Sequence, residues 1–273
     1  MTGETGTLDL LTFHLGNPSR EEAERQLAYL AARPEAVLVL TDTAHSAGCD
    51  LLAARFTAAG YSVTYPRPAR GERGVMIVSR LATEPGPVSL RYLPYRAVSV
   101  TVQTDMGPLD VVGVAVPPRD GLDTKVRRKR VFLQECRVGL PRAKSGHRAL
   151  IGSFNLLESP PTPQHEFLQA FESSFNLWLS AIGYRDAFRK LYPTMPEHSR
   201  AAPTGERHRF EQAHVSVALV TALRACSYVH EPRTKAEPLT GHSALTMSLA
   251  MRPAEPLRAT DPVWPRDAAP GLP

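Results

Sequence analysis

Several residues able to do chemistry stand directly after short apolar runs of this chain. Gly152-Ser153-Phe154-Asn155 closes the run Ala149-Leu150-Ile151, and Asp42 and His14 end two earlier apolar runs. Hydroxyl, amide, carboxylate and imidazole groups are those that acid–base catalysis and divalent-ion binding use. The elements that carry these runs therefore decide whether the residues meet in one site.

The hydrophobic pattern predicts a layered α/β fold, because short apolar runs typical of strands alternate with a few amphipathic helices. Ser19 and Glu22 form a capping box at the start of the first helix, and Gly60 closes the second. The expected strands cover residues 8–15, 36–41, 61–65, 74–79, 97–104, 109–116, 149–152, 210–217, 225–230 and 243–250. The expected helices cover residues 19–33, 49–59, 125–138 and 164–178.

Seven segments, in their order along the chain, resemble motifs of the endonuclease/exonuclease/phosphatase superfamily. Residues 71–80 resemble its glycine-led strand ending in Ser-Arg, and residues 113–120 are similar to the Gly-Val-Tyr-Val-Pro-Ser-Arg-Asp of a variant branch. The resemblance covers residues 9–249, which is nearly the whole chain. The seven segments are residues 11–14, 39–42, 71–80, 113–120, 152–155, 209–211 and 240–243.

This resemblance implies a four-layer α/β sandwich, in which two mixed, mainly antiparallel sheets lie face to face with helices outside. A single domain would cover residues 1–251, followed by a proline-rich tail over residues 252–273. The resemblance also implies an active site where the strand ends converge, and hydrolysis of phosphoesters with a bound divalent ion.

Four positions of the family's active site hold a different residue here. Asp42 stands at the metal-binding Glu, and His14 stands at the Asn that orients the phosphate. Ser153 replaces the Asp that activates the attacking water or handles the proton of the leaving group, and Gly241 replaces the acidic residue of Ser-Asp-His. A serine hydroxyl cannot take that proton at neutral pH, and losing a general acid or base costs about 10² to 10⁴ in rate. We expect ordinary phosphodiester hydrolysis to be slow or absent.

The resemblance leaves one catalytic pair in place. His242 matches the family's catalytic histidine, and Glu211 matches the residue that hydrogen-bonds it. The implied pocket also contains Ser153 and Asn155, so a Ser-His-Glu arrangement is one hypothesis, with Asn155 and His14 as oxyanion donors. The other is that Ser153 merely fills the place of the lost acid. The candidate catalytic residues are His242, Glu211, Ser153 and Asn155.

The candidate substrate-binding residues are His14, Asp42, Arg119 and Asp120. Arg119 and Asp120 follow a Pro-Pro pair on a loop at a strand end, where a solvated turn is the alternative. For His14 the alternative is a histidine satisfied by a backbone partner. We expect no metal cofactor. If the chain is instead a metal enzyme, Asp42 and His14 would bind Mg²⁺ or Mn²⁺.

Composition fits one globular domain, with 273 residues of which 42% are apolar and 22% charged. We expect a cytoplasmic protein, because the sequence has neither a long apolar span nor a signal peptide. The three cysteines lack metal-ligand spacing, which predicts reduced, buried thiols. The other histidines, His198 and His230 among them, show no metal-ligand spacing either.

The net charge of +5 comes largely from a basic run within residues 125–130. This run opens a predicted helix, and we expect most of its charges on a solvated face, with a phosphate-facing patch as the alternative. No aromatic residues interleave with it to stack on bases, so nucleic-acid binding has weak support.

Three functions follow from these residues. We favour a repurposed, metal-independent enzyme acting on a small organic substrate, and the richness in Ala, Arg and Pro suggests the specialised metabolism of a high-GC bacterium. The second is a diverged divalent-metal-dependent phosphoesterase or nuclease. The third is a catalytically dead binding protein that retains the cleft.

Overall fold

The computed structural model describes residues 6–118, 123–156, 170–202 and 205–264. The strands are β1 (Leu8–His14), β2 (Val37–Thr43), β3 (Ser62–Thr64), β4 (Gly74–Ser79), β5 (Glu84–Pro85), β6 (Ala97–Val102), β7 (Leu109–Ala115), β8 (His147–Ser153), β9 (Tyr184–Asp186), β10 (Arg200–Ala201), β11 (Arg207–His208), β12 (Glu211–Ser216), β13 (Leu223–Val229) and β14 (Ala244–Leu249). The helices are α1 (Arg20–Ala31), α2 (Ala47–Ala58), α3 (Asp123–Gly139), α4 (Ala170–Ala181), α5 (Ala187–Leu191) and α6 (Glu231–Thr234), with 3₁₀ turns at Pro94–Arg96 and Val217–Leu219.

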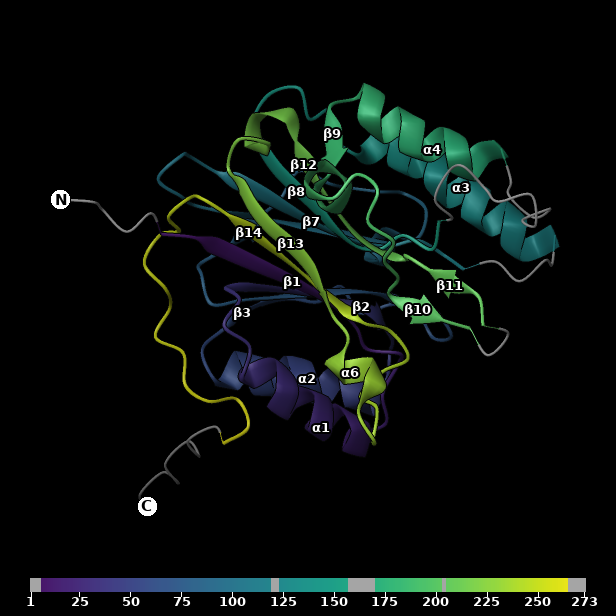
Figure 1. Cartoon of the computed structure of the whole chain (residues 1–273). Coiled ribbons are helices and arrows are strands. Elements are labelled where there is room, and N and C mark those ends of the chain that lie inside the picture. Colours follow the sequence, from purple (N-terminus) through teal and green to yellow (C-terminus); the bar gives the residue numbers. More distant parts are fainter. Residues whose placement is uncertain (1–5, 119–122, 157–169, 203–204, 265–273) are drawn as a thin grey trace, which may run out of the picture.

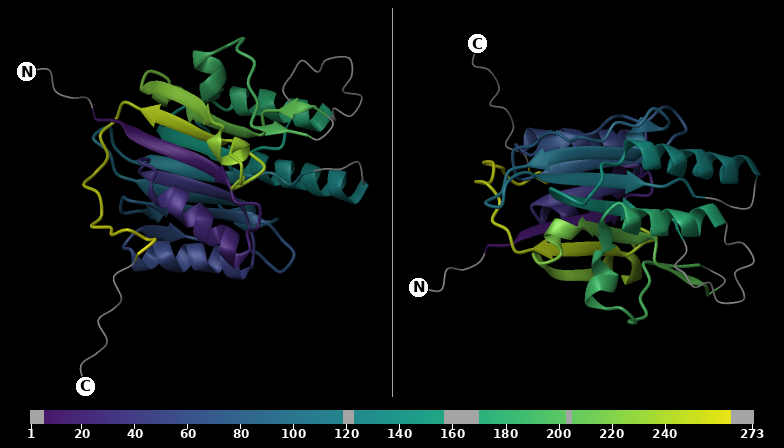
Figure 2. Two further views of the ribbon diagram at one scale, coloured as in Figure 1. Left: turned by 60° about the horizontal axis from the view of Figure 1, so that its bottom comes forward. Right: turned by 90° about the horizontal axis from the view of Figure 1, so that it is seen from above.

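Two six-stranded sheets lie face to face (Figure 1). Their strand orders are β13-β14-β1-β2-β4-β3 and β5-β6-β7-β8-β12-β9, and β10 pairs with β11 in a separate ribbon. Within the sheets β1 runs parallel to β2 and β7 runs parallel to β8, while the other pairs are antiparallel. The α1–α2 pair covers the outer face of the first sheet, and α3 and α4 cover that of the second (Figure 2). The expected four-layer sandwich is confirmed.

Alternation along each strand decides which core a side chain enters. In β2, Val37 and Val39 join the core between the sheets, whereas Leu38 and Leu40 pack in the core beneath α1 and α2. Both faces of this strand are therefore buried, which is why its sequence is a continuous apolar run.

The helices begin where their capping residues place them. Ser19 Oγ accepts a hydrogen bond from the backbone N–H of Glu22, whose carboxylate accepts one from the backbone N–H of Ser19. This capping box confirms the predicted start of α1, and Leu27 and Leu30 then lie buried on its inner face. In the second helical layer, Phe132 and Cys136 of α3 pack under the second sheet.

Short elements were not predicted, because they carry little periodic pattern. These are β5, β9, β10, β11, α5 and α6, each two to five residues long.

The described part of the proline-rich tail runs along the body of the protein. Its Leu257 backbone N–H donates to Arg80 O at 2.7 Å, and its Thr260 N–H donates to Ala59 O at 2.8 Å. Among the described residues, no helix combines the length and the apolar character needed to cross a membrane.

Topology brings the candidate residues to one end of the sandwich. The parallel strands β1 and β2 end together, at His14 and near Asp42. Because β12 is antiparallel to β8, the start of β12 at Glu211 lies opposite the end of β8 at Ser153. In the same way β14 is antiparallel to β1, so His242, which precedes β14, returns to the end of β1.

Gly152 is required where β8 lies against β7. Its φ is +151°, and a Cβ at this position would lie 2.0 Å from the backbone oxygen of Val114. We predict that Gly152→Ala lowers the free energy of unfolding by about 3 kcal/mol, because a strand backbone cannot yield as a side chain can. Urea denaturation measures this. Gly241→Ala is the control, since a Cβ there would meet nothing within 4 Å, and equal losses in the two variants would contradict the prediction.

Candidate active site

A cleft of about 760 Å³ lies at the strand ends where the candidate residues meet. Four residues expected from the sequence line it, namely His14, Asp42, Asn155 and His242. Two arginines that sequence reasoning did not single out, Arg200 and Arg233, line it as well. Gly241 also belongs to the lining and leaves open space beside it, because it carries no side chain.

His242 and Glu211 form a buried pair, as predicted from their positions. The distance from His242 Nδ1 to Glu211 Oε1 is 2.9 Å, and both side chains are almost wholly inaccessible to solvent. Burial by itself would raise the pKa of Glu211, but the charge and hydrogen bond of His242 outweigh it and lower the pKa to about 2. Glu211 is therefore an ionised acceptor that fixes the orientation of the imidazole.

The ring of His14 stacks on the ring of His242. Their centroids are 3.9 Å apart and their planes differ by 6°. Burial, and then the nearby His242, lower the pKa of His14 to about 4, so its imidazole is neutral at physiological pH. Its Nδ1 is buried and lacks a hydrogen-bond partner in the described part of the chain, so the backbone partner considered from the sequence is not found.

Asp42 reaches the cleft because the β2–β4 pairing is irregular. The register shifts between Thr41 and Thr43, and Asp42 has a φ of +58°. A bulge of this kind re-aims a side chain that simple alternation would place elsewhere. The Asp42 carboxylate lies 3.4 Å from Arg73 Nε and 3.9 Å from His14 Nε2, measured to the same oxygen, Oδ2.

The cleft residues do not fit a divalent-ion site. A hard ion such as Mg²⁺ needs several oxygen ligands, usually including one or two carboxylates. Asp42 already faces the guanidinium of Arg73, Glu211 is bound to His242, and Gly241 offers no ligand. Across residues 6–118, 123–156, 170–202 and 205–264, no group of three or more His, Cys, Asp or Glu side chains could hold a metal ion.

Ser153 does not complete a triad. It is buried opposite Glu211 in the β8–β12 register, and its Oγ makes no hydrogen bond within the described residues. The hydrogen-bonded Ser-His-Glu arrangement considered from the sequence is therefore not formed, and the arrangement reduces to the pair of His242 and Glu211. Asn155 has a φ of +48°, and its side-chain amide donates to Val116 O at 2.8 Å.

A buried ion pair contacts the backbone of Asn155. Lys129 and Glu172, on α3 and α4, are each 1% exposed, and Lys129 Nζ lies 2.8 Å from Glu172 Oε1. The same ammonium donates to the backbone oxygen of Asn155. The basic run was expected to face solvent for the most part, and Lys129 is the exception. Its neighbour Arg128 pairs with Glu72.

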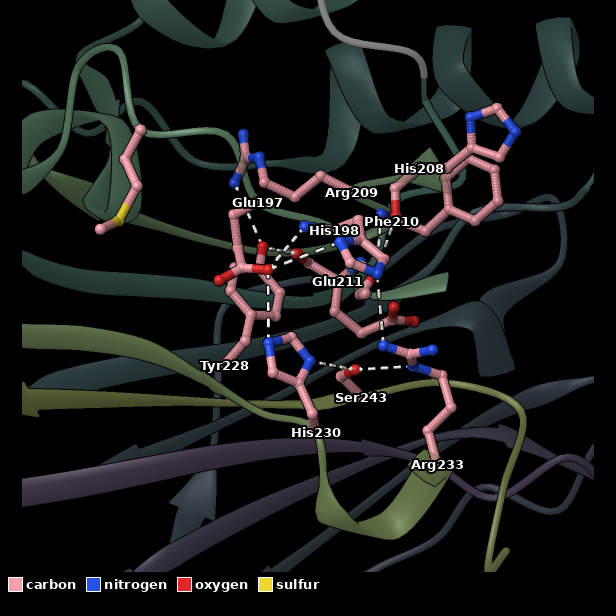
Figure 3. Close-up of polar contacts among 12 residues, drawn as sticks. Glu197, His198, His208, Arg209, Phe210, Glu211, Tyr228, His230, Arg233 and Ser243 are labelled. Carbon is pink, nitrogen blue, oxygen red and sulfur yellow. Dashed lines mark hydrogen bonds and ion pairs between the residues drawn. The ribbon is translucent and has the colours of Figure 1, made fainter. Parts of the chain in front are cut away.

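A second polar cluster lies beside Glu211 and was missed from the sequence (Figure 3). Glu197 lies between His198 and His230, whose rings stack with centroids 5.8 Å apart. Arg233 and Ser243 complete this cluster. The cluster is formed by residues 197–198, 230–233 and 243 of the chain. No regular spacing in the sequence predicts that these residues meet. Arg119 and Asp120, also candidates from the sequence, lie outside the described residues.

His214 belongs to a different part of the protein. It lines a separate cavity of about 570 Å³ beside α4, and its ring packs 4.9 Å from that of Phe154. Burial lowers the pKa of His214 to about 4, more than the nearby Asp186 raises it. Its Nε2 is paired with Gln212 Oε1 at 3.1 Å. This position supports a structural role.

Comparison with known proteins gives structural matches only. No protein-family model matches the chain, and no curated protein sequence matches it. The 3′ phosphatase NExo from Neisseria, bound to a product DNA hairpin, is 20% identical with a TM-score of 0.75, over 89% of this chain and 99% of its own. An AP endonuclease from Archaeoglobus fulgidus is 18% identical with a TM-score of 0.71, over 88% of this chain and 98% of its own.

The Xenopus laevis APE2 catalytic domain is 14% identical with a TM-score of 0.68, over 90% of this chain and 93% of its own. All three have the endonuclease/exonuclease/phosphatase fold. The chain therefore has the fold of this superfamily, and the resemblance proposed from the sequence motifs is confirmed at that level.

Removing one member of the buried Lys129–Glu172 pair should be costly. We predict that Lys129→Met lowers the free energy of unfolding by about 3 kcal/mol or more, because Glu172 is then buried without this cation. Urea denaturation measures the change. Arg127→Met, on the exposed face of the same helix, should change stability by less than about 0.5 kcal/mol. A comparable loss in both variants would show that the pair contributes little.

His214 should make stability depend on pH. Between about pH 6.5 and pH 4 the unfolded chain protonates this histidine and the folded protein does not, so stability falls as the pH falls. The shift corresponds to a loss of up to about 3 kcal/mol. We predict that the free energy of unfolding depends less steeply on pH in His214→Phe than in the wild type over this window. His14 contributes to the remaining slope in both the variant and the wild type. Urea denaturation at several pH values checks this, and parallel slopes would refute it.

Proposed function

We propose that this chain is a metal-independent acid–base enzyme that acts on a small organic substrate in the cleft. The observation that carries the proposal is the buried 2.9 Å hydrogen bond between His242 and Glu211 at a cleft of about 760 Å³. A cleft of this size lies within the range of small-molecule sites. The endonuclease/exonuclease/phosphatase fold supports the location of the site but not the choice of substrate.

The direction of the hydrogen bond assigns the proton on His242. The ionised Glu211 can only accept, so His242 Nδ1 carries a hydrogen, and Nε2 is the nitrogen left to act as the base. In the proposed reaction, Nε2 takes a proton from the substrate or from water. The imidazolium that forms is stabilised by Glu211, and Nε2 then returns the proton to the leaving group. Ser153 has no part in this scheme.

Other cleft residues would bind the substrate. Neutral His14 stacks on His242 and restricts the rotation of its ring. Arg200 and Arg233 would stabilise negative charge that develops on the substrate. The richness of the sequence in Ala, Arg and Pro is the support for a place in bacterial specialised metabolism.

A metal-dependent phosphoesterase is the second candidate, favoured by the fold alone. Structures with this fold include a 3′ phosphatase bound to a product DNA hairpin and an AP endonuclease. Against it stands the carboxylate of Asp42, which already faces Arg73. The two candidates differ in their need for a divalent ion, which is directly measurable.

Turnover without metal is the test of the proposal. Metal-stripped protein in EDTA is assayed on a panel of small nitrophenyl esters and phosphoesters. We predict turnover that EDTA does not remove and that His242→Ala lowers about 100-fold or more, because the general base is lost. His45→Ala is the matched control, since His45 is exposed and outside the cleft, and it should retain full activity.

Two results would overturn the proposal. Turnover that is lost in EDTA, restored by Mg²⁺ or Mn²⁺ and abolished by Asp42→Ala would return the protein to the metal-dependent phosphoesterases. Turnover that His242→Ala leaves intact would remove the catalytic role of the His–Glu pair.

A further inference from the structure

Arg233 lies on the wall of the cleft and is held there by two uncharged partners. Its Nε donates to Ser243 Oγ at 3.0 Å, and its Nη2 lies 3.3 Å from His198 Nε2 (Figure 3). Arginine has five N–H groups and no acceptor, so every one of these contacts must run outward from the guanidinium. That constraint limits where the neighbouring protons can be.

The first arm of the cluster runs through His230. Ser243 Oγ lies 2.8 Å from His230 Nδ1. Ser243 Oγ accepts from Arg233 and keeps a second lone pair and its own hydrogen, so it can exchange a hydrogen bond with His230 Nδ1 in either direction. His230 Nε2 lies 3.4 Å from Glu197 Oε1. This arm therefore connects Arg233 with Glu197.

The second arm runs through His198 and ends on the same oxygen. His198 Nε2 faces the Arg233 guanidinium and must be the acceptor, so Nδ1 carries the hydrogen of a neutral ring. That nitrogen lies 3.8 Å from Glu197 Oε1. Burial, and then the charges of Arg233 and Arg207, lower the pKa of His198, which agrees with a neutral ring.

Two histidines thus separate a guanidinium from a carboxylate in a closed ring of contacts. The ring consists of Arg233, Ser243, His230, Glu197 and His198. The groups that face its histidines are Glu197, Arg233 and Arg207, together with the Tyr228 ring, which stacks on His230 at 6.4 Å. Protonation of His198 at Nε2 would remove the acceptor that faces the Arg233 guanidinium and open that arm.

The same segments also carry the catalytic pair. Ser243 follows His242 directly, and its backbone N–H donates to Ser199 O at 2.7 Å. The hydroxyl of Ser199 accepts from the backbone N–H of Glu211 at 3.2 Å. The ring therefore holds Arg233 in a fixed position relative to His242 and Glu211.

The charge of Arg233 is not neutralised nearby. Among residues that the structure describes, neither Arg233 nor Arg200 has a carboxylate within ion-pair distance. Both line the cleft beside His242. Two such guanidinium groups in the lining of one cleft favour an anionic ligand, which would form charge-assisted hydrogen bonds with them.

We propose that Arg233, with Arg200, binds an oxyanion of the substrate, and that the ring through His198 and His230 positions Arg233 and loosens when His198 is protonated. The inference rests on the proposed function in one respect, because it assumes that the anion binds in the same cleft in which the proposed reaction takes place. The ligand is a phosphate, sulfate or carboxylate group on a small molecule.

Anion binding by the metal-stripped full-length chain tests the role of Arg233. Isothermal titration in EDTA at pH 7.5 with inorganic sulfate, and separately with malonate, distinguishes a tetrahedral anion from a carboxylate. We expect one of the two anions to bind. Arg233→Gln should weaken this binding roughly tenfold or more, because one charge-assisted hydrogen bond to the anion is lost. Lys235→Gln, at a half-buried cation of the same segment that pairs with Glu231 and does not line the cleft, should not change it. Binding of neither anion, or equal binding by wild type and Arg233→Gln, would overturn the inference.

The positioning role is tested by pH in a His242→Gln background, where the catalytic imidazole adds no charge. Sulfate keeps its charge between pH 7.5 and 5.5, so only the protein titrates. We expect sulfate binding, or malonate binding corrected for its own ionisation, to weaken several-fold at pH 5.5. With His198→Gln added, whose amide oxygen accepts without titrating, the weakening should be smaller. General attraction to added positive charge predicts stronger binding at low pH, and that result would refute the ring mechanism.

Failure of this inference can be told from failure of the proposed function. If Arg233→Gln binds the anion normally while His242→Ala loses turnover, only the role of Arg233 is wrong. If anion binding follows the expected pattern while His242→Ala keeps its turnover, only the catalytic proposal is wrong.

Discussion

The hydrogen bond between His242 and Glu211 joins the two sheets of the sandwich at their open end. His242 precedes β14 of the first sheet, and Glu211 begins β12 of the second. Because the ionised carboxylate is fully buried, its partner cannot be removed without leaving an uncompensated charge inside the protein. The stacking of His14 and the contacts of Ser199 and Ser243 are arranged around this bond, so the cleft exists in its observed form only while the two sheets keep their relative position.

Three carboxylates at or near the cleft face a partner within the protein. Asp42 faces Arg73, Glu172 faces Lys129, and Glu211 faces His242. A metal centre would need several carboxylate oxygens to be available at once. Among the described residues, Arg200 and Arg233 differ from these groups, because no carboxylate lies within ion-pair distance of either guanidinium.

Local pattern predicted most of the helices and longer strands, the resemblance to the superfamily predicted how they form a sandwich, and non-local contacts limited the prediction of the site. The capping box of Ser19 and Glu22 and the limits of β4 depend on neighbouring residues and were found from the sequence. The bulge at Asp42 and the burial of Lys129 depend on how distant elements pack, and periodicity does not encode them. The cluster of His198 and His230 requires segments more than thirty residues apart to meet. The pairing of His242 with Glu211 was reached only through the ordered motifs of the superfamily.

Gly241 leaves room in the lining of the cleft. A Cβ at this position would meet no atom within 4 Å. The shape of the cleft therefore does not depend on a glycine at residue 241, and the first atom of a side chain there would enter open space and not displace a neighbour.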